Sequence, residues 1–310
     1  MKIALLFAGQ GAQQPGMTNG IEHFPDAQKI FTRAQELTNL PLIELCKNGP
    51  AEELNQTIAA QPALYTQGFA LFDALRTRLP QLSPAFCAGL SLGEFTAHAA
   101  AGSYTFTDGL RLVSERASAM QDACTITRGG MTSLIGASAE QAAHIANQLD
   151  IDVANYNSPG QIVLSGPLEK LSAIPDLAKA AGIKRAIPLK VSGAFHSRLM
   201  QPAADRLRKA LDSTPWKQPR CPVVANVTAA PCEDPALFPE LLARQVTGSV
   251  RWDESIRFLR DAGVTLFLEI GPGEVLAGLN KRIDPALRTI SLPDFTALDH
   301  VAKELEKLLA

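Results

Sequence analysis

Cysteine is scarce in this chain. Only five of its 310 residues are cysteines, an odd number, and no two of them form a C-x-x-C pair. An odd count argues against a disulfide framework, and C-x-x-C pairs are a common basis of zinc sites. We therefore expect mostly buried, free thiols and no bound metal.

Long apolar runs and an excess of one charge are also missing. The N-terminus has six consecutive apolar residues, Ile3 to Ala8, whereas a membrane helix needs about 20 and the apolar core of a signal peptide is longer than six. The formal net charge is −2, so the chain lacks the basic field typical of nucleic-acid-binding proteins. We expect a soluble, cytoplasmic protein that binds neither membranes nor nucleic acid.

Short apolar runs bounded by glycine or proline are plentiful, and the clearest are IALLFAG, PAFCAGL, PVVANVT and TLFLEIG. Runs of this kind, alternating with helical stretches, are typical of strands buried in a parallel sheet. The chain is 46% hydrophobic and longer than one usual domain, so it can bury a large core and still carry a smaller unit. We expect a large α/β body over residues 1–127 and 191–310.

Residues 128–190 have a different pattern. They predict a strand (MTSLIGA), a helix opened by a Ser138/Gln141 capping box, two strands joined through NSPG, a second helix (LEKLSAIPDLAKAAG) and a last strand (IKRAIPLKV). The order β-α-β-β-α-β is the ferredoxin-like arrangement. We expect a small subdomain inserted in the body, with the active site in the cleft between the two.

Ser91 is the first candidate for chemistry. It lies between Gly89 and Gly93, after a predicted strand and before an alanine-rich helical stretch. In a G-x-S-x-G elbow the glycines permit a cramped turn that exposes the serine hydroxyl at a helix N-terminus. Glycines also punctuate ordinary loops, so the spacing alone leaves a structural turn equally open.

A nucleophilic serine needs a general base, and the chain offers five histidines. Four of them fall inside predicted helices or in polar terminal regions. His196 instead follows the last strand of the small subdomain, in a glycine-containing turn that opens a helix. It is the best placed base, although a histidine that only packs or caps at this position is an open alternative.

Two further polar residues draw attention. Gln10 lies in the loop FAGQGAQQPGM, which lacks the G-K-[ST] ending of a phosphate loop; its amide could serve an oxyanion hole, or the loop could be a simple turn. Arg116 lies among the apolar neighbours Leu112, Val113 and Met120 on a predicted helix, so its stem is expected to be buried. A buried arginine needs an anion, which is either a structural carboxylate or a substrate carboxylate.

Seven motifs lie between Gly9 and Arg282: GQGAQ, GLSLGE, SERASAM, NYNSPGQIVLSG, GAFHSRLM, QVTGSVRW and EIGPGEVLAGLNKR. Together and in this order they resemble the malonyl-CoA:acyl carrier protein transacylase family and the acyltransferase domains of polyketide synthases. The resemblance implies an α/β-hydrolase-like body with a parallel sheet and the inserted ferredoxin-like subdomain.

The resemblance also implies roles for single residues. Ser91 is then the nucleophile and His196 the base, and the Gln10 side chain and the Leu92 backbone N–H form the oxyanion hole. Arg116 is the clamp for the malonyl carboxylate. The remaining implied residues are Asn157 and Phe195 at the substrate and Gln245, whose main-chain carbonyl orients the histidine.

Three positions depart from the family pattern. Leu90 stands where a histidine usually precedes the serine, Ala8 replaces a proline, and Ala117 replaces a glycine. None of these removes a catalytic group. The motif GAFHS resembles that of malonyl-selective polyketide acyltransferases more than that of many fatty-acid enzymes. Both the fatty acid and the polyketide pathway therefore stay open.

The implied activity is that of an acyl-carrier-protein S-malonyltransferase, a monomer whose partners are malonyl-CoA and acyl carrier protein. It needs no cofactor, because the coenzyme A thioester is itself a substrate. A serine hydrolase or thioesterase with the same Ser-His pair is the alternative, and a non-enzymatic carrier-binding protein is a third. Arg116 separates the first from the second, since a generic esterase has no need of a carboxylate clamp.

A short basic stretch after His196 is a candidate docking surface for an acidic carrier protein. It contains Arg206, Arg208, Lys209, Lys217 and Arg220. A solvated helix face with no partner is the alternative. Other basic candidates are Lys184, Arg185, Lys281 and Arg282.

Overall fold

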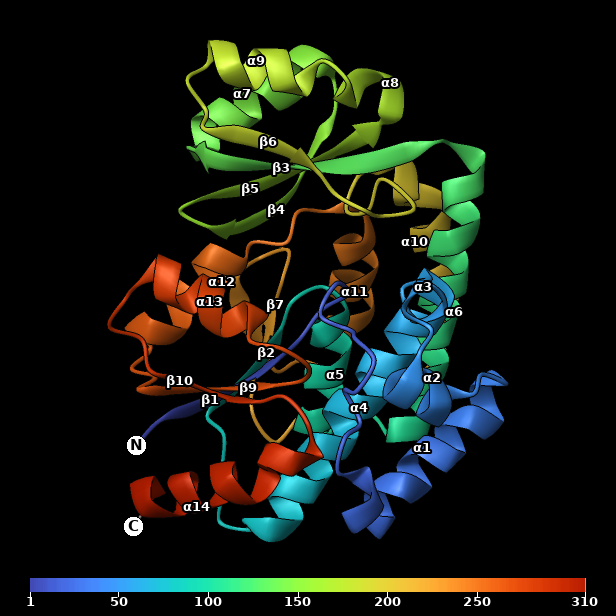
Figure 1. Ribbon diagram of the computed structural model, residues 1–310, viewed down its shortest axis with the longest axis vertical. Helices are drawn as coiled ribbons and strands as arrows, with labels where there is room; N and C mark the ends of the chain where they lie inside the picture. The colour runs from blue at the N-terminus through green and yellow to red at the C-terminus, as the bar shows by residue number, and fades with distance from the viewer. Residues whose placement is uncertain (310) are drawn as a thin grey trace.

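The computed structural model describes residues 1–309, which form two sheets surrounded by helices. Figure 1 shows the smaller sheet above the larger one, with the helices α7, α8 and α9 on its outer side. No helix among these residues combines the length and the apolar character that crossing a bilayer requires. The expected mixed α/β fold is confirmed.

The larger sheet has six strands in the order β10-β9-β1-β2-β7-β8. The first five are parallel to their neighbours and β8 is antiparallel to β7. Their bounds are β1 Ile3–Phe7, β2 Phe86–Gly89, β7 Val223–Ala225, β8 Ala230–Cys232, β9 Leu266–Ile270 and β10 Thr289–Leu292. The apolar runs seen in the sequence are therefore the buried central strands of this sheet.

Alternate residues of β1 explain how the sheet holds its two helical layers. Leu5 and Phe7 belong to the large core cluster on one face, whereas Ala4 and Leu6 pack with Trp252 on the other. Successive side chains of a strand point to opposite faces, so a strand covered on both sides must be apolar throughout. This accounts for the unbroken run IALLF.

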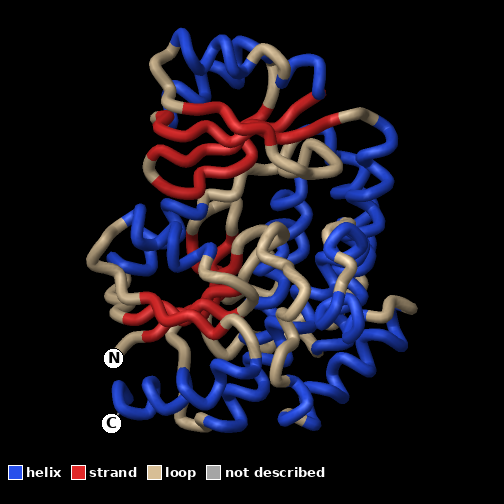
Figure 2. The backbone as a smooth tube through the Cα atoms, viewed as in Figure 1, coloured by secondary structure: helices blue, strands red, loops and turns tan. Residues whose placement is uncertain are grey.

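The helices of the body cover both faces of this sheet (Figures 1 and 2). The helices that precede the small sheet in the chain are α1 Pro25–Thr38, α2 Leu42–Asn48, α3 Ala51–Leu54, α4 Thr57–Arg78, α5 Leu92–Ala101 and α6 Phe106–Ile126. The later ones are α10 Gln201–Asp212, α11 Phe238–Thr247, α12 Trp252–Asp261, α13 Val275–Ile283 and α14 Leu298–Leu309.

The smaller sheet is antiparallel, with the order β4-β5-β3-β6. Its elements are β3 Gly129–Ala137, α7 Ala139–Leu149, β4 Asp152–Ser158, β5 Gly160–Pro167, α8 Leu168–Leu171, α9 Ile174–Ala180 and β6 Arg185–Pro188. The capping box is present: Ser138 Oγ accepts from the Gln141 N–H, and the Gln141 side chain accepts from the Ser138 N–H. This order of strands and helices is ferredoxin-like.

The second helix of the small unit differs from expectation. The sequence LEKLSAIPDLAKAAG predicts one helix, but the structure divides it into α8 and α9. Pro175 lies in the first turn of α9, where its missing N–H costs nothing, and its ring disfavours a continuous helix through the preceding residues. The proline therefore starts a new helix.

Candidate active site

A cavity of about 960 Å³ opens between the two sheets. Ser91, Arg116 and His196 line it from the body, and Asn157 and Val163 line it from the small sheet. The cavity therefore brings together residues that are far apart in the sequence.

Ser91 sits on a sharp turn between β2 and α5. Its backbone angles are φ 53° and ψ −104°, a conformation that is strained for a residue with a side chain. The turn is possible because its flanks are glycines: a Cβ on Gly89 would lie 2.0 Å from the carbonyl carbon of Gly93, and one on Gly93 would lie 2.1 Å from the Phe7 carbonyl oxygen. The G-x-S-x-G spacing thus reflects backbone contacts that leave no room for a methyl group.

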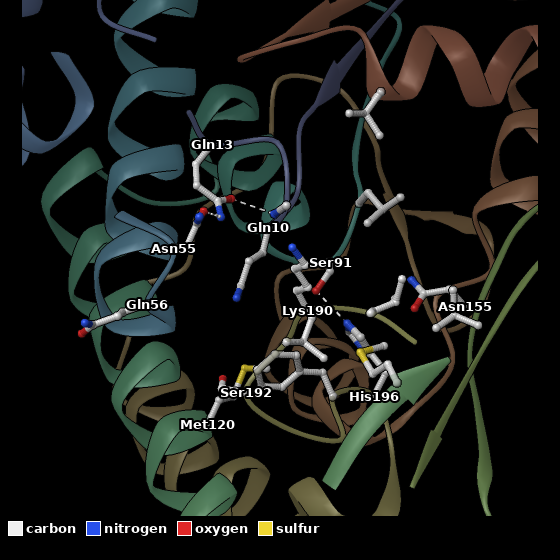
Figure 3. A pocket seen from close by; sticks show the side chains of 18 of the residues that line it. Gln10, Gln13, Asn55, Gln56, Ser91, Met120, Asn155, Lys190, Ser192 and His196 are labelled. Carbon is white, nitrogen blue, oxygen red and sulfur yellow. Dashed lines mark hydrogen bonds between the residues drawn. The ribbon is translucent and has the colours of Figure 1, made fainter. Parts of the chain in front are cut away.

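His196 contacts this serine directly. The Ser91 Oγ lies 2.7 Å from His196 Nε2, a hydrogen bond marked by a dashed line in Figure 3. His196 Nδ1 lies 2.8 Å from the main-chain oxygen of Gln245. A carbonyl oxygen can only accept, so Nδ1 carries the hydrogen and Nε2 of the neutral ring accepts from the serine hydroxyl. The arrangement can therefore remove the serine proton.

The electrostatic surroundings keep this imidazole neutral. Burial, followed by the positive charge of Arg116, lowers the pKa of His196 to about 4, although the carbonyls of Gln245 and Gly248 act in the opposite direction. A neutral ring is the form that can act as a base.

Arg116 reaches the same serine from α6. Its side chain is buried, and Nη2 donates to Ser91 Oγ and to Gln245 Oε1, both at 3.0 Å, while Nη1 donates to Gln61 Oε1 at 2.8 Å. Within residues 1–309 no carboxylate forms an ion pair with it, and its Nε has no partner. Burial lowers the pKa of Arg116 to about 10, with Glu94 opposing the shift, so the guanidinium is charged at neutral pH. No carboxylate in these residues contacts Arg116 directly, and Glu94 lies beyond the Gln245 side chain, which favours a substrate anion as the direct partner.

The two candidate oxyanion donors lie near the serine. Gln10 lines the cavity (Figure 3). Its Nε2 donates weakly to Thr57 Oγ1 and its Oε1 accepts from Gln61, both at 3.3 Å. Leu92 is the first residue of α5, so its N–H is one of the helix donors that have no intrahelical acceptor.

Phe195, Asn157 and Leu90 also line the cavity. Phe195 is buried beside His196, and the buried Oδ1 of Asn157 has no hydrogen-bond partner in the described part of the chain. Leu90 presents an apolar side chain where the family pattern has histidine. All eight residues selected from the sequence therefore lie in or against one site, if Gln245 and Leu92 are counted by their main-chain groups.

The sequence did not identify the residues that support the Ser91 turn on the side away from the cavity. Asn226 Oδ1 accepts from the Ser91 N–H at 2.7 Å, and its Nδ2 donates to the Gly89 carbonyl at 2.8 Å. Glu94, inside the motif GLSLGE, accepts from the N–H of Asn226 and from the Gln245 side chain. A polar residue at the end of the strand-like run PVVANVT was the one available signal for Asn226.

Two of the five basic residues in the stretch after His196 are paired with carboxylates. Arg206 contacts Glu115 and Asp122, and Arg208 contacts Asp212 and Glu240. Neither arginine lines the cavity. The free positive charge expected from these two positions is therefore reduced. In residues 1–309 no three histidine, cysteine or acidic side chains gather closely enough to hold a metal ion.

Comparisons with known proteins give a consistent result. Residues 4–286 match the family described as acyl transferase domain. The malonyl CoA-acyl carrier protein transacylase of Bacillus subtilis (strain 168) is 40% identical over 312 residues, covering 99% of this chain and 98% of that protein.

Solved structures agree with this match. The acyl-carrier-protein S-malonyltransferase of Burkholderia pseudomallei 1710b is 38% identical with a TM-score of 0.93, covering 98% of this chain and all of that one. A malonyl-transacylase in complex with its type II PKS acyl-carrier protein is 36% identical with a TM-score of 0.94, over 98% of this chain and 100% of that one. The chain belongs to the acyl transferase family that includes the malonyl-CoA:acyl carrier protein transacylases.

Proposed function

We propose that this chain transfers a malonyl group from malonyl-CoA to the phosphopantetheine thiol of an acyl carrier protein, in fatty acid or polyketide biosynthesis. The observation that carries the proposal is the position of Arg116, a buried cation with no carboxylate partner in the described residues, 3.0 Å from Ser91 Oγ. Such a group pairs well with the free carboxylate of a malonyl thioester. The names of the similar proteins support the same activity.

In the first half-reaction Ser91 Oγ attacks the thioester carbonyl and His196 Nε2 takes the hydroxyl proton. The carbonyl oxygen becomes negative and is held by the Gln10 amide and the Leu92 N–H. Collapse of the tetrahedral intermediate breaks the C–S bond, and the coenzyme A sulfur leaves with the proton from His196. The product is an ester between malonate and Ser91.

The second half-reaction reverses these steps with a different thiol. His196 takes the proton of the carrier's phosphopantetheine thiol, and the sulfur attacks the ester carbonyl. Ser91 Oγ then leaves and regains its proton from His196. Thioester, ester and thioester interconvert without any change of oxidation state, so the chemistry itself calls for no redox cofactor.

The other lining residues have supporting roles in this proposal. The Gln245 carbonyl keeps His196 in the active tautomer, as its 2.8 Å contact with Nδ1 supports. Phe195 and Asn157 contact the acyl chain and the pantetheine arm. Residues 128–190, inserted between body segments 1–127 and 191–310, form the unit that closes one side of the cavity.

The carrier protein is proposed to approach the mouth of the cavity beside α13. Val275 and Leu279 of this helix line the cavity, and Arg282 at its end donates to Gln161, another lining residue. Lys281 and Arg282 therefore place positive charge close to the mouth. This position suits an acidic carrier better than the paired arginines of α10.

Intact mass after incubation with malonyl-CoA tests the proposal. We expect a malonyl adduct on Ser91 that moves to holo carrier protein when the carrier is added. An adduct that is lost to water and never reaches the carrier would identify a hydrolase instead. The absence of any adduct would contradict both enzymatic functions.

A further inference from the structure

Glu94 is a buried carboxylate that lies behind the site and does not line the cavity. It is the third residue of α5, close beneath Ser91. Its Oε2 accepts from Gln245 Nε2 at 2.7 Å and from the Asn226 N–H at 3.1 Å, and its Oε1 has no partner within residues 1–309. The proposed reaction steps do not use this residue. Burying a carboxylate costs free energy, which its hydrogen bonds only partly offset, so its presence here calls for an explanation.

The Gln245 side chain connects Glu94 to Arg116. Its Nε2 donates to Glu94 and to the Ser91 carbonyl oxygen, at 2.7 and 2.9 Å, while its Oε1 accepts from Arg116 Nη2 at 3.0 Å. Arginine can only donate, and the Ser91 carbonyl oxygen can only accept. The amide between them is therefore held in one orientation, with its oxygen toward the guanidinium.

Arg116 depends on this support. Its guanidinium has three acceptors, the side-chain oxygens of Gln61 and Gln245 and the Ser91 hydroxyl. The serine hydroxyl is consumed in the acyl-enzyme, so the two glutamines alone then aim the guanidinium. Gln245 in turn is anchored by its hydrogen bond to Glu94 Oε2, an oxygen that accepts whether or not the carboxyl group carries a proton on Oε1.

We propose that Glu94 is a positioning residue for substrate selection: by anchoring the Gln245 side chain, it holds Arg116 in place to bind the carboxylate of a malonyl group. The inference rests on the proposed function. Glu94 touches no substrate, and its effect should therefore appear in the preference for malonyl over acetyl rather than in the chemistry of Ser91 and His196. Its second bond, to Asn226, supports the serine turn and acts on both acyl groups alike.

The test compares kcat/KM for acylation by malonyl-CoA and by acetyl-CoA. Glu94→Ala removes the anchor, and we expect the malonyl-to-acetyl ratio to fall at least about tenfold. Glu94→Gln keeps an oxygen at the position of Oε2, where it accepts both hydrogen bonds, and we expect it to restore most of the ratio. Equal losses on the two substrates, or an unchanged ratio, would overturn the proposal.

Glu269 provides a matched control. It is also fully buried, but its carboxylate accepts from the N–H groups of Leu276 and Ala277 and from the Ser291 hydroxyl, away from Arg116. Glu269→Ala should lower the melting temperature without changing the malonyl-to-acetyl ratio. A ratio that falls as much in this variant as in Glu94→Ala would show a general response to losing a buried carboxylate, and would contradict the proposal.

A double-variant comparison tests the route through Arg116. In an Arg116→Ala background there is no clamp to position, so adding Glu94→Ala should leave the ratio unchanged within about twofold to threefold. A further tenfold change there would refute the assigned route. If Glu94→Ala fails to fold, Gln245→Leu replaces it, since it removes the side-chain amide and keeps the main-chain carbonyl that contacts His196; the same selective loss is expected.

Failure of the inference and failure of the proposed function give different results. The wild-type protein is tested first for the malonyl adduct on Ser91. If that adduct forms and the Glu94→Ala ratio is unchanged, the positioning role alone is wrong. If the adduct never forms, the proposed function is wrong, whatever the variants do.

Discussion

The guanidinium Nη2 of Arg116 lies 3.0 Å from the Ser91 hydroxyl oxygen, which itself lies 2.7 Å from His196 Nε2. One oxygen thus contacts both a fixed positive charge and a neutral base. The positive charge lowers the pKa of the histidine, and it also stabilises negative charge that develops on the serine oxygen. The residue that we propose to bind the substrate carboxylate therefore also acts on the proposed nucleophile and base.

Replacing Arg116 should separate the two acyl donors. We expect Arg116→Ala to lose far more malonyl transfer than acylation by acetyl-CoA, because an acetyl thioester has no free carboxylate to pair with the guanidinium. Single-turnover acylation followed by mass spectrometry measures both. Parallel losses with the two donors would show that Arg116 only supports the fold.

Removing the nucleophile or the base should have different consequences. Ser91→Ala should form no adduct, since no other hydroxyl occupies the turn. His196→Ala should still acylate, but slower by a factor of about 10² to 10⁴, the usual contribution of a general base. Rapid-quench measurement of the acylation rate checks this, and near-normal turnover in either variant would rule out the assignment.

The low pKa of His196 predicts the acid limb of acylation. With a pKa of about 4, the ring remains neutral and active as the pH falls through 6.5, the ordinary value for histidine. The acylation rate should therefore stay near its neutral value down to about pH 5 and decline only toward 4. A rate that halves near pH 6.5 would show that Arg116 and burial do not act on His196 as the structure indicates.

Glu94 should make the folded protein less stable as the pH rises toward neutral. Burial raises its pKa to about 7, against hydrogen bonds from Gln245 and Asn226 and the charge of Arg116, which lower it. The folded state then holds this proton more tightly than the unfolded chain, so Glu94 reduces stability as the pH rises from 4.5 to about 7.

Glu94→Gln removes that titration. Its unfolding free energy relative to wild type should increase across this window by up to about 3 kcal/mol, since one pKa unit is worth about 1.4 kcal/mol. Urea unfolding of both proteins at pH 5 and pH 8 gives the comparison. His98 and His196 titrate in both proteins and cancel in the difference. A difference that is the same at the two pH values would contradict the raised pKa.

Charge reversal should locate the carrier surface. Lys281→Glu at the end of α13 is expected to raise KM for carrier protein several-fold and to leave acylation by malonyl-CoA unchanged, because the cavity is intact. Lys209→Glu on α10 is the matched control and should change neither. Measurements at low ionic strength are needed, since salt screens such contacts. A larger effect at Lys209 would return the surface to the stretch after His196.

Much of the site could be predicted because its residues carry local signals. The spacing of Gly89, Ser91 and Gly93 predicts a tight turn, and the position of His196 between a predicted strand and a predicted helix marks it as a candidate base. Gln61 carries no such signal, and Asn226 has only its polar side chain in a strand-like run. Gln61 meets Arg116 across 55 residues of chain and Asn226 meets Ser91 across 135, through packing that no local pattern encodes. The break between α8 and α9 differs from the single helix that the apolar pattern predicts, because Pro175 in the first turn of α9 starts a new helix.

The base of this site is oriented by the main chain of Gln245, not by an acidic side chain. Every residue has a carbonyl oxygen, so the orienting atom survives any substitution at position 245 that preserves the path of α11. Replacing residues one at a time by alanine would therefore not reveal the group that orients His196. The contribution would become visible only through backbone chemistry, such as an ester in place of the following amide, which weakens that carbonyl as an acceptor while leaving every side chain in place.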